Sequence, residues 1–457
     1  MKNRWLVAFL IGIFLECTGQ ITSPRLAYSS KSHPSNALCM PDSILKIISD
    51  QIDANLIQLG KKDSEYRVNA SPNAILLDWP LKLAKGFPDL PFVHVQPYFD
   101  VDKRAGQLLD FSCGRRTYDG HNGTDMGTWP FTWLKMDEGS VDIVSAADGI
   151  IVAKHDGDYD RSCGTSGNIG NYVIIQHADG SKCHYWHMKK GSVLPKEIGS
   201  YVLKGEYLGK IGSSGNSSAP HLHFGVQNAS GEFIDPHSGK CNFSTTSWLN
   251  QKPYNDPTLH FLTTHASGKG PVFPPCPQPE EPNIQKDFKP GDGVLFSAYF
   301  HDQLPGDVAH YRVYQPDGSV FSAWTQIMQD TLQLSLWVFE KYLPLFSQEG
   351  KWKFETAFYG KTLSTDFNVN TTTGNGDRSV PYVSLYPNPA NNHISINLGK
   401  PYPTIEVKII NTLGQLIQHK MYKNASEIQV EISGGIGVYH AIIKSGNDST
   451  IRRFVKL

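Results

Sequence analysis

The chain has 457 residues, which is too long for a single hydrophobic core and enough for two to four domains. Its formal net charge is -1 at pH 7, so charge gives no reason to expect binding to nucleic acid or to an anionic membrane surface. With 41 Gly, 29 Pro and 11% aromatic residues, the composition favours turn-rich β structure over long helices.

Residues 1–19 have the pattern of a secretory signal peptide. Lys2 and Arg4 form a basic start, and Trp5 to Leu15 form an apolar run that is too short to span a bilayer. Cys17 raises the alternative of a lipoprotein, but the residue before it is a Glu, where that signal needs a small residue. No later stretch is apolar enough for a membrane helix. We therefore expect an exported protein with no transmembrane segment in the mature chain.

Six cysteines remain after the signal peptide: Cys39, Cys113, Cys163, Cys183, Cys241 and Cys276. An even number of cysteines in an exported chain predicts disulfide bonds. None of them has the paired CxxC spacing of a structural zinc site.

Residues 20–90 contain one amphipathic helix candidate, SILKIISDQIDANLIQLG, which is a pro-segment, a brace for the next domain, or both. Residues 91–250 show short β segments broken by Gly, which predicts an antiparallel β-sheet domain. Within it, QHADGSKCHYWH has the pattern of two strands joined by a turn at Asp179-Gly180.

The rest of the chain is predicted to form two small β-sandwich domains, so the fold class is mainly β. Residues 251–285 contain GPVFPPCPQPEEPN, which predicts an extended Pro-rich linker. Residues 286–372 include KWKFETAF, whose alternation is typical of an immunoglobulin-like (Ig-like) sandwich. A second linker over 373–382 leads to residues 383–457, which show the same alternation and turns.

The stretch HLHF carries the first sign of chemistry. In a strand, His221 and His223 would point to the same face, although such a pair alone is more often an exposed surface feature. The same β region contains DGHNGTDMG, which adds His121 and Asp125. Two histidines and one carboxylate are a ligand set that zinc favours in catalytic sites, with a fourth position for water. No HExxH motif occurs, so histidines are the available general bases.

Three motifs resemble those of the lysostaphin-type (LytM-like) zinc metallopeptidases and occur in that family's order: HNGTD, CHYWHM and APHLHF, within roughly residues 105–228. The resemblance implies a β-rich, Gly-preferring endopeptidase that cuts peptidoglycan peptides. It also implies one zinc ion per chain, bound by His121, Asp125 and His223. His187 and His221 would flank the metal, help to activate water and stabilise the oxyanion.

The segment TWPFTWLKMDEGSVD departs from the family pattern because it is longer and more aromatic. If it is extended, Trp129, Phe131 and Trp133 lie on one face, where they line a substrate groove or pack against the sheet. Tyr185 of the second motif is a further substrate-binding candidate. His184 is expected on the strand face opposite His187, away from the site.

The last segment resembles the type A C-terminal sorting domain of type IX secretion cargo. The resemblance rests on LYPNPANN, NTLGQLI, GVYHAII and the basic final strand IRRFVKL. It implies the type IX secretion machinery as a partner and a secreted, extracellular or cell-surface location reached via the periplasm. A plain adhesive β-domain is the alternative.

The sequence therefore predicts an exported zinc metalloendopeptidase that attacks peptidoglycan stem or cross-bridge peptides with zinc-activated water. A secreted protease of Gly-rich proteins is a second enzymatic interpretation. A cell-wall-binding module without catalytic activity is the non-enzymatic alternative.

Overall fold

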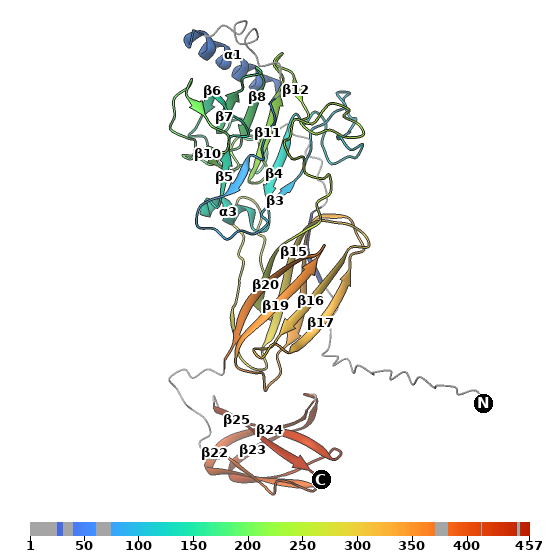
Figure 1. Ribbon diagram of the computed structural model, residues 1–457. Helices are drawn as coiled ribbons and strands as arrows, with labels where there is room; N and C mark the ends of the chain where they lie inside the picture. The colour runs from blue at the N-terminus through green and yellow to red at the C-terminus, as the bar shows by residue number, and fades with distance from the viewer. Residues whose placement is uncertain (1–24, 31–39, 61–74, 371–382, 413, 446–447) are drawn as a thin grey trace, which may run out of the picture. The chain divides into compact units, whose positions relative to one another are not determined.

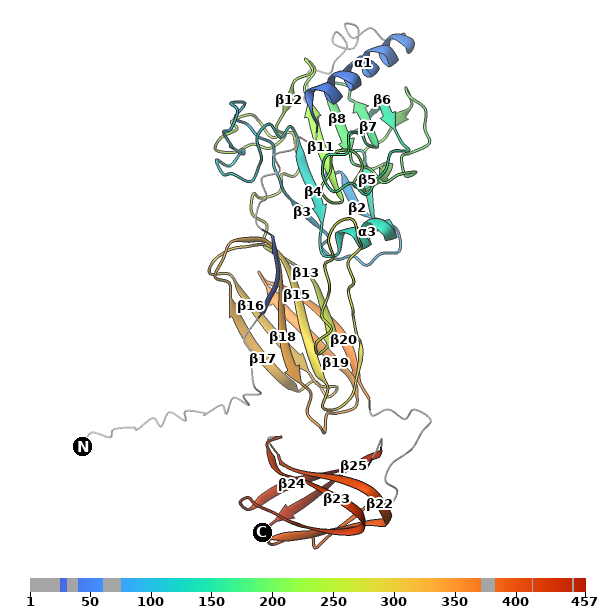
Figure 2. The same ribbon diagram turned by 180° about the vertical axis from the view of Figure 1, so that it is seen from behind.

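The computed structural model describes residues 25–30, 40–60, 75–370, 383–412, 414–445 and 448–457 (Figure 1 and Figure 2). The predicted signal peptide and the predicted linker over 373–382 lie outside these ranges. No helix within them is long and apolar enough to cross a membrane. The chain divides into two units. The first comprises the chain up to Lys286 with Gly293–Lys341 and Lys351–Phe367, and the second Asp287–Asp292, Tyr342–Gly350 and Asn368–Leu457.

An eight-stranded antiparallel sheet forms the centre of the first unit, in the order β3-β4-β11-β8-β7-β6-β9, with β12 paired to β11. Its strands are β3 (Val93–Val95), β4 (Thr124–Thr128), β6 (Gly149–His155), β7 (Tyr172–Gln176), β8 (Lys182–Trp186), β9 (Tyr201–Val202), β11 (His221–Gln227) and β12 (Phe233–Ile234). A three-stranded sheet, β10-β5-β2, comprises β10 (Tyr207–Lys210), β5 (Val141–Val144) and β2 (Leu81–Leu83). Buried apolar side chains of both sheets form one core, so most strand residues are buried.

The predicted hairpin turn at Asp179-Gly180 is confirmed between β7 and β8. Gly180 has φ +82, a conformation that glycine adopts without steric cost. The Asp179 carboxylate accepts a hydrogen bond from the Ser181 N–H, which fixes the turn.

The predicted amphipathic helix is also confirmed, as α1 (Asp42–Gln58). Its buried residues Ile48, Ile52 and Leu56 pack in one cluster with apolar side chains of the large sheet. Figures 1 and 2 both show α1 lying over β6. The helix therefore packs against the large sheet, and its role as a pro-segment, a brace or both stays a prediction.

Two further sheets of the first unit form the Ig-like sandwich. One has the order β1-β18-β15-β13, with β1 (Arg25–Ser30), β18 (Leu332–Tyr342), β15 (Gly293–Gln303) and β13 (Thr258–Ala266). The other contains β20 (Lys361–Val369), β19 (Gly350–Phe358), β16 (Val308–Tyr314) and β17 (Val320–Ile327). Rings from the two sheets meet in the core, with the centroids of Phe296 and Phe354 4.9 Å apart. The alternation in KWKFETAF is confirmed, because Trp352, Phe354, Thr356 and Phe358 are buried.

The prediction of an extended linker over 251–285 is wrong. Residues 258–266 form β13, which pairs with β15 along its length and completes the sandwich. The Pro-rich segment after it folds back on itself, with a bridge between Val272 and Glu281. Proline prevents regular pairing within this segment, but it leaves the neighbouring strand free to pair. We call residues 271–282 the Pro-rich loop.

Two disulfides join cysteines far apart in the chain: Cys113–Cys241 and Cys163–Cys276. The expectation of disulfide bonds is confirmed for these four cysteines, whereas Cys183 is a free thiol in the core of the large sheet. Its place on a fully buried strand leaves it beside apolar side chains. Cys39 lies outside the described residues.

The second unit is built mainly from one five-stranded antiparallel sheet, with β21 (Ser384–Tyr386), β22 (His393–Asn411), β23 (Leu416–Glu431), β24 (Gly437–Ser445) and β25 (Asp448–Lys456). The 19 residues of β22 pair with three other strands, with an irregularity between Asn397 and Tyr402. A single continuous sheet thus encloses the core, where two separate sheets were expected. The short β14 (Asp287–Phe288) pairs with the last residues of β20. The predicted fold class, mainly β with a sheet domain followed by further β domains, is confirmed.

Candidate metal centre and active site

The adjacent strands β4 and β11 bring Asp125, His221 and His223 together. In the antiparallel pair β4–β11, His223 lies opposite Asp125 and His221 lies opposite Gly127. Residues directly opposite each other share one face of the sheet, as do residues two apart in one strand. Asp125 accordingly lies within 3.4 Å of both histidines. The expectation that His221 and His223 project to one side is confirmed.

The loop before β4 supplies His121, and Gly123 explains how it fits. A Cβ atom at Gly123 would lie 2.6 Å from the His223 ring and 2.9 Å from the Phe224 carbonyl oxygen. Neither contact is tolerable for a real side chain, so only glycine lets the loop pass this close to β11. The glycine between His121 and Asp125 is therefore required by the packing of His223.

Three ligand-type atoms converge at this point. His121 Nε2 lies 3.2 Å from both Asp125 Oδ1 and His223 Nδ1, and the latter two atoms are 2.8 Å apart. All three residues are buried. The His121 Nδ1–H donates to the Tyr98 carbonyl at 2.6 Å, which leaves its Nε2 lone pair directed at the group. Two imidazole nitrogens and one carboxylate oxygen are suited to a divalent transition metal such as zinc.

His187 and His221 lie beside this group without belonging to it. Their ring centroids are 4.6 Å apart, and the His187 ring is 6.0 Å from that of His223. Each donates Nδ1–H to a backbone carbonyl at 2.7 Å, His187 to Ser214 and His221 to Ala219. The Nε2 atoms of both rings are buried and have no hydrogen-bond partner among the described residues. They are available to a substrate or a water molecule.

His187 reaches the site because the chain turns at the end of β8. It directly follows the last strand residue and has φ +64, a left-handed conformation that is uncommon outside glycine. Such outliers persist only where the surroundings enforce them, and they concentrate at functional sites. Its Met188 neighbour returns to the core, where it is fully buried.

Burial and mutual charge set the ionisation of the cluster. Burial alone would raise the pKa of Asp125, but the charges and hydrogen bonds of the nearby histidines, first among them His121 and His221, hold it well below its usual range. Burial lowers the pKa of His187 well below its ordinary value, and His221 and His223 add to the effect. Burial likewise lowers the pKa of His223, against the pull of Asp125. These histidines are therefore neutral at pH 7, the form that binds a metal or accepts a proton.

A groove of about 490 Å³ borders the site, and Asp125 and His221 form part of its lining. Tyr28, His94, Phe273 and Leu334 from segments distant in sequence also line the groove, as does Trp129 just after β4.

The extended arrangement predicted for Trp129, Phe131 and Trp133 is wrong. Phe131 has φ +61 and precedes α3 (Thr132–Glu138), which contains Trp133. The Glu280 carboxylate accepts hydrogen bonds from the first N–H groups of this helix, a partner that the local sequence does not reveal. Of the three aromatic residues, Trp129 borders the groove, whereas Phe131 and Trp133 are buried away from it.

Tyr185 is not placed to bind substrate. It is fully buried in the core, and its hydroxyl accepts a hydrogen bond from the Ala146 N–H. His184 lies outside the site, as expected: its Nε2 is 3.0 Å from the Gln227 side-chain oxygen, and its ring packs against Phe233. Both are structural residues.

Sequence reasoning missed His94 and the two aromatic residues Tyr28 and Phe273. His94 on β3 lies opposite Gly127, and a Cβ at Gly127 would be 2.4 Å from its ring. In the sequence, the alternation in Val93-His94-Val95 indicates only that His94 lies on one face of a strand. It does not indicate that this strand pairs with the strand that contains Gly127. Tyr28 and Phe273 lie 4.7 Å apart between ring centroids, and no motif connects their segments.

Comparison with known proteins agrees with this geometry. Residues 121–236, which hold all five site residues, match the model of peptidase family M23. The chain contains an M23 peptidase domain. This family comprises the LytM-type enzymes and is metal-dependent, so the resemblance inferred from the three motifs is confirmed.

Curated relatives match about a fifth of this chain. The chain is 34% identical over 94 residues to the DD-carboxypeptidase/endopeptidase Mpg of Neisseria meningitidis serogroup B, covering 21% of this chain and 19% of the relative. It is 32% identical over 104 residues to the peptidoglycan DD-endopeptidase ShyA of Vibrio cholerae, covering 23% of this chain and 19% of the relative. The chain thus spans about a fifth of the length of these relatives.

Among solved structures, a putative peptidase M23 from Pseudomonas aeruginosa matches with 20% identity over 41% of this chain and 59% of its own, at a TM-score of 0.22. Dimeric latent PorU from Porphyromonas gingivalis matches with 12% identity over 68% of this chain and 34% of its own, at a TM-score of 0.16. Scores this low say nothing about the arrangement of the whole chain.

Residues 384–457 match the secretion system C-terminal sorting domain. The type IX resemblance of the last segment is therefore confirmed. A tail of this kind implies the type IX machinery as a partner and a secreted or cell-surface protein.

Proposed function

We propose that this protein is a zinc metalloendopeptidase that is exported by the type IX system and hydrolyses peptide bonds of peptidoglycan. The convergence of His121 Nε2, Asp125 Oδ1 and His223 Nδ1, with two further histidines beside them, carries the proposal. The M23 domain match supports the reaction class, and the sorting domain supports the route.

The donor set fits zinc. His121, Asp125 and His223 would hold one ion, which leaves a coordination position for water, as in catalytic zinc sites. Zinc supplies a Lewis acid that lowers the pKa of a bound water to about 7 and polarises the carbonyl under attack. The low pKa of Asp125 and the neutral state of His223 keep these ligands ready to bind at neutral pH.

His187 and His221 are the proton-handling groups of the proposal. Because their Nδ1–H groups are bound to Ser214 and Ala219, their Nε2 atoms carry the lone pairs that face the site. A neutral Nε2 accepts the proton of the attacking water, and the resulting N–H donates to the charged oxygen of the tetrahedral intermediate. The same N–H can protonate the leaving amine.

The substrate class rests on the named relatives. Mpg and ShyA are called a DD-carboxypeptidase/endopeptidase and a peptidoglycan DD-endopeptidase. We accordingly propose a stem or cross-bridge peptide as the substrate, and the lysostaphin-type motifs favour a Gly-containing one. In the predicted path, the signal peptide directs the chain to the periplasm and the sorting domain directs it outward.

Digestion of purified peptidoglycan from several bacteria tests the proposal. Mass spectrometry of the released fragments should show new amino and carboxyl ends at one peptide bond type, and a Gly-rich protein serves as the competing substrate. The His187→Ala variant is the control for a contaminating hydrolase. A metal-loaded protein that releases no fragments from any wall preparation would contradict the proposal and favour a binding role.

A further inference from the structure

The groove of the M23 domain is completed by residues from outside it. Tyr28 comes from β1, Phe273 from the Pro-rich loop and Leu334 from β18 of the sandwich, and all three lie in the lining beside Trp129. None of the three belongs to the segment 121–236 that matches the family model. One wall of the groove is therefore a feature of this chain rather than of the M23 domain alone.

The wall is a single aromatic cluster. The ring centroids of Tyr28 and Phe273 are 4.7 Å apart, those of Tyr28 and Trp129 5.1 Å, and those of Trp129 and Phe273 5.8 Å. Trp129 is buried and supports the other two, which remain partly exposed where they border the groove. We call Tyr28, Trp129 and Phe273 the aromatic wall.

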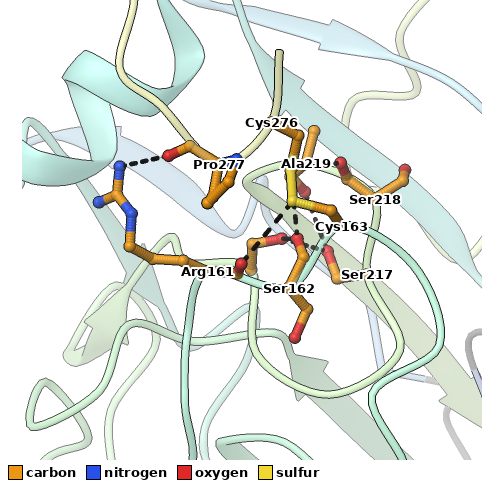
Figure 3. Close-up of a disulfide and its surroundings, with 9 residues drawn as sticks. Arg161, Ser162, Cys163, Ser217, Ser218, Ala219, Cys276 and Pro277 are labelled. Atoms are coloured by element: carbon orange, nitrogen blue, oxygen red, sulfur yellow. Dashed lines mark hydrogen bonds between the residues drawn. A yellow bond between two sulfur atoms is a disulfide. The ribbon is translucent and has the colours of Figure 1, made fainter.

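Covalent and polar contacts fix the Pro-rich loop in this position. The Cys163–Cys276 disulfide joins the loop to the segment before Gly164, which also lines the groove. Figure 3 shows Cys276 and Pro277 beside the segment 217–219, with Cys276 Sγ 3.7 Å from the Ser218 carbonyl oxygen. Arg161 donates a hydrogen bond to the Pro277 carbonyl at 2.7 Å.

The C-terminal end of the Pro-rich loop is also fixed by hydrogen bonds. Glu280 accepts hydrogen bonds from the Trp133 and Leu134 N–H groups at the start of α3. The loop is therefore anchored at Cys276, Pro277 and Glu280. A wall held this firmly keeps a fixed distance from the site, which selectivity for one substrate position requires.

Strand geometry gives that distance. Asp125, Gly127 and Trp129 alternate along β4 and its continuation, and all three border the groove. At about 3.3 Å per residue, the Cα of Trp129 lies about 13 Å along the strand from that of Asp125. An extended peptide covers this distance in about three to four residues. The aromatic wall therefore meets a substrate at that separation from the bond being cut.

The chemical character of the aromatic wall determines which substrate side chains bind there. Apart from Asp125 and Glu280, none of the described side chains that line the groove carries a permanent charge, and Glu280 is already bound to backbone N–H groups. A carboxylate of the substrate pressed against these aromatic rings would lose hydration without gaining a partner, because the ring faces carry partial negative charge. An apolar side chain would gain contact area there.

We propose that Tyr28, Trp129 and Phe273 form a specificity-determining subsite that receives an apolar residue of the substrate peptide three to four positions from the scissile bond. The inference rests on the proposed peptidase function and names the substrate class that this site prefers. The Cys163–Cys276 disulfide positions the wall, because it ties the Phe273 segment to the groove.

Matched fluorogenic peptides test this subsite. The peptides share the bond identified in the wall digest and differ only in carrying Leu or Glu three or four positions from it, on either side. The wild type should cleave the Leu peptides with a kcat/KM at least tenfold above that for the Glu peptides, on one side of the bond only. Phe273→Ala and Tyr28→Ala should reduce that ratio by about tenfold, mainly through KM.

Further variants separate this role from a loss of fold. Phe243→Ala removes an aromatic side chain that is 90% exposed and outside the groove, so the ratio should not change. Phe273→Leu keeps apolar volume and should restore most of the preference. Zinc content and melting temperature should stay at wild-type values in every variant used.

The outcomes are distinguishable. A wild type that cleaves Leu and Glu peptides equally well, or Phe273→Ala and Tyr28→Ala variants with an unchanged ratio, would overturn the subsite. A wild type that cleaves none of the peptides and no wall fragment would instead overturn the proposed function on which the subsite depends.

Discussion

The rings of His187 and His221 lie 4.6 Å apart between centroids, and one short segment orients both of them. His187 donates its Nδ1 proton to the Ser214 carbonyl and His221 donates its own to that of Ala219. Both acceptors belong to the stretch SSGNSSA that precedes β11. The Gly-rich approach to the third motif therefore has a physical role, because its backbone sets the tautomer of two histidines that bind no metal in the proposed site.

Removal of either ring should abolish turnover while leaving the metal in place. We expect His187→Ala and His221→Ala to retain zinc and to lose about 10²- to 10⁴-fold in kcat, the usual effect of losing one proton-transfer or oxyanion-stabilising group. Cleavage of a wall peptide and zinc content, measured on the same samples, check this. Loss of zinc in either variant would instead make that histidine a ligand.

The His184→Ala variant is the control that distinguishes a loss of stability from a loss of catalytic activity. His184 is buried, and its Nε2 lies 3.0 Å from the Gln227 side-chain oxygen, so the variant should lose about 1–3 kcal/mol of unfolding free energy. Its kcat at a temperature where it is folded should match the wild type. A folded but inactive His184→Ala protein would mean that the roles of the histidines must be reassigned.

Asp125→Ala should lose most of the metal. Asp125 Oδ1 is the carboxylate oxygen of the convergent group, within 3.2 Å of ligand-type nitrogens of both His121 and His223. We expect about one zinc per chain in the wild type by elemental analysis and a small fraction of that in the variant. The folded state of the variant is checked by circular dichroism. Full zinc retention would show that the ligand set is wrong.

The sequence predicted which residues meet at the candidate site, but it did not predict the residues that surround them. The reason is the sequence separation of the contacts involved. His121, Asp125, His187, His221 and His223 sit in short motifs on neighbouring strands, so period-two geometry and motif order predict their meeting. The orienting carbonyls are backbone atoms, which carry no residue signature.

Long-range packing explains the errors. Phe131 adopts a left-handed conformation before α3, whose first N–H groups bond to Glu280 in a distant loop, so local alternation misleads there. In the same way, β13 lies in a stretch whose neighbouring prolines indicated a linker. Its pairing with β15 is a tertiary contact that composition does not encode.

Acid should destabilise the fold through its buried histidines. Burial lowers the pKa of His184 to about 3, against an unfolded value near 6.5. Between these values the unfolded chain binds a proton that the folded chain does not, so stability is complete above about pH 6.5 and falls as the pH drops toward 3. Each such histidine contributes up to about 1.4 kcal/mol per pH unit.

Urea unfolding at pH 7.5 and pH 5 measures this dependence. His184→Gln should show a smaller loss of unfolding free energy between the two pH values than the wild type. His155→Gln, at a half-exposed position, serves as the matched control and should behave like the wild type. An equal loss in His184→Gln and the wild type would rule out His184 as a source of the effect.

Thiol labelling should distinguish Cys183 from the bridged cysteines. In the native protein it should not react, because it is fully buried and burial raises the pKa of its thiol. After unfolding without a reducing agent, peptide mapping should find Cys183 labelled. Cys113, Cys241, Cys163 and Cys276 should be labelled only after reduction. Labelling of Cys163 or Cys276 before reduction would show that the disulfide proposed to position the aromatic wall is absent.

Deletion of residues 384–457 should separate export from catalysis. The sorting domain has its own apolar core, and every residue of the proposed active site lies in the first unit. The truncated protein should therefore fold, bind zinc and cleave wall peptides in periplasmic extracts, while it fails to appear in the medium or at the cell surface. The full-length His187→Ala protein is the matched control, because it should be exported although it is inactive.

Wild-type amounts of the truncated protein outside the cell would show that another segment directs export. An inactive truncated protein that still holds zinc would show that the sorting domain contributes to catalysis.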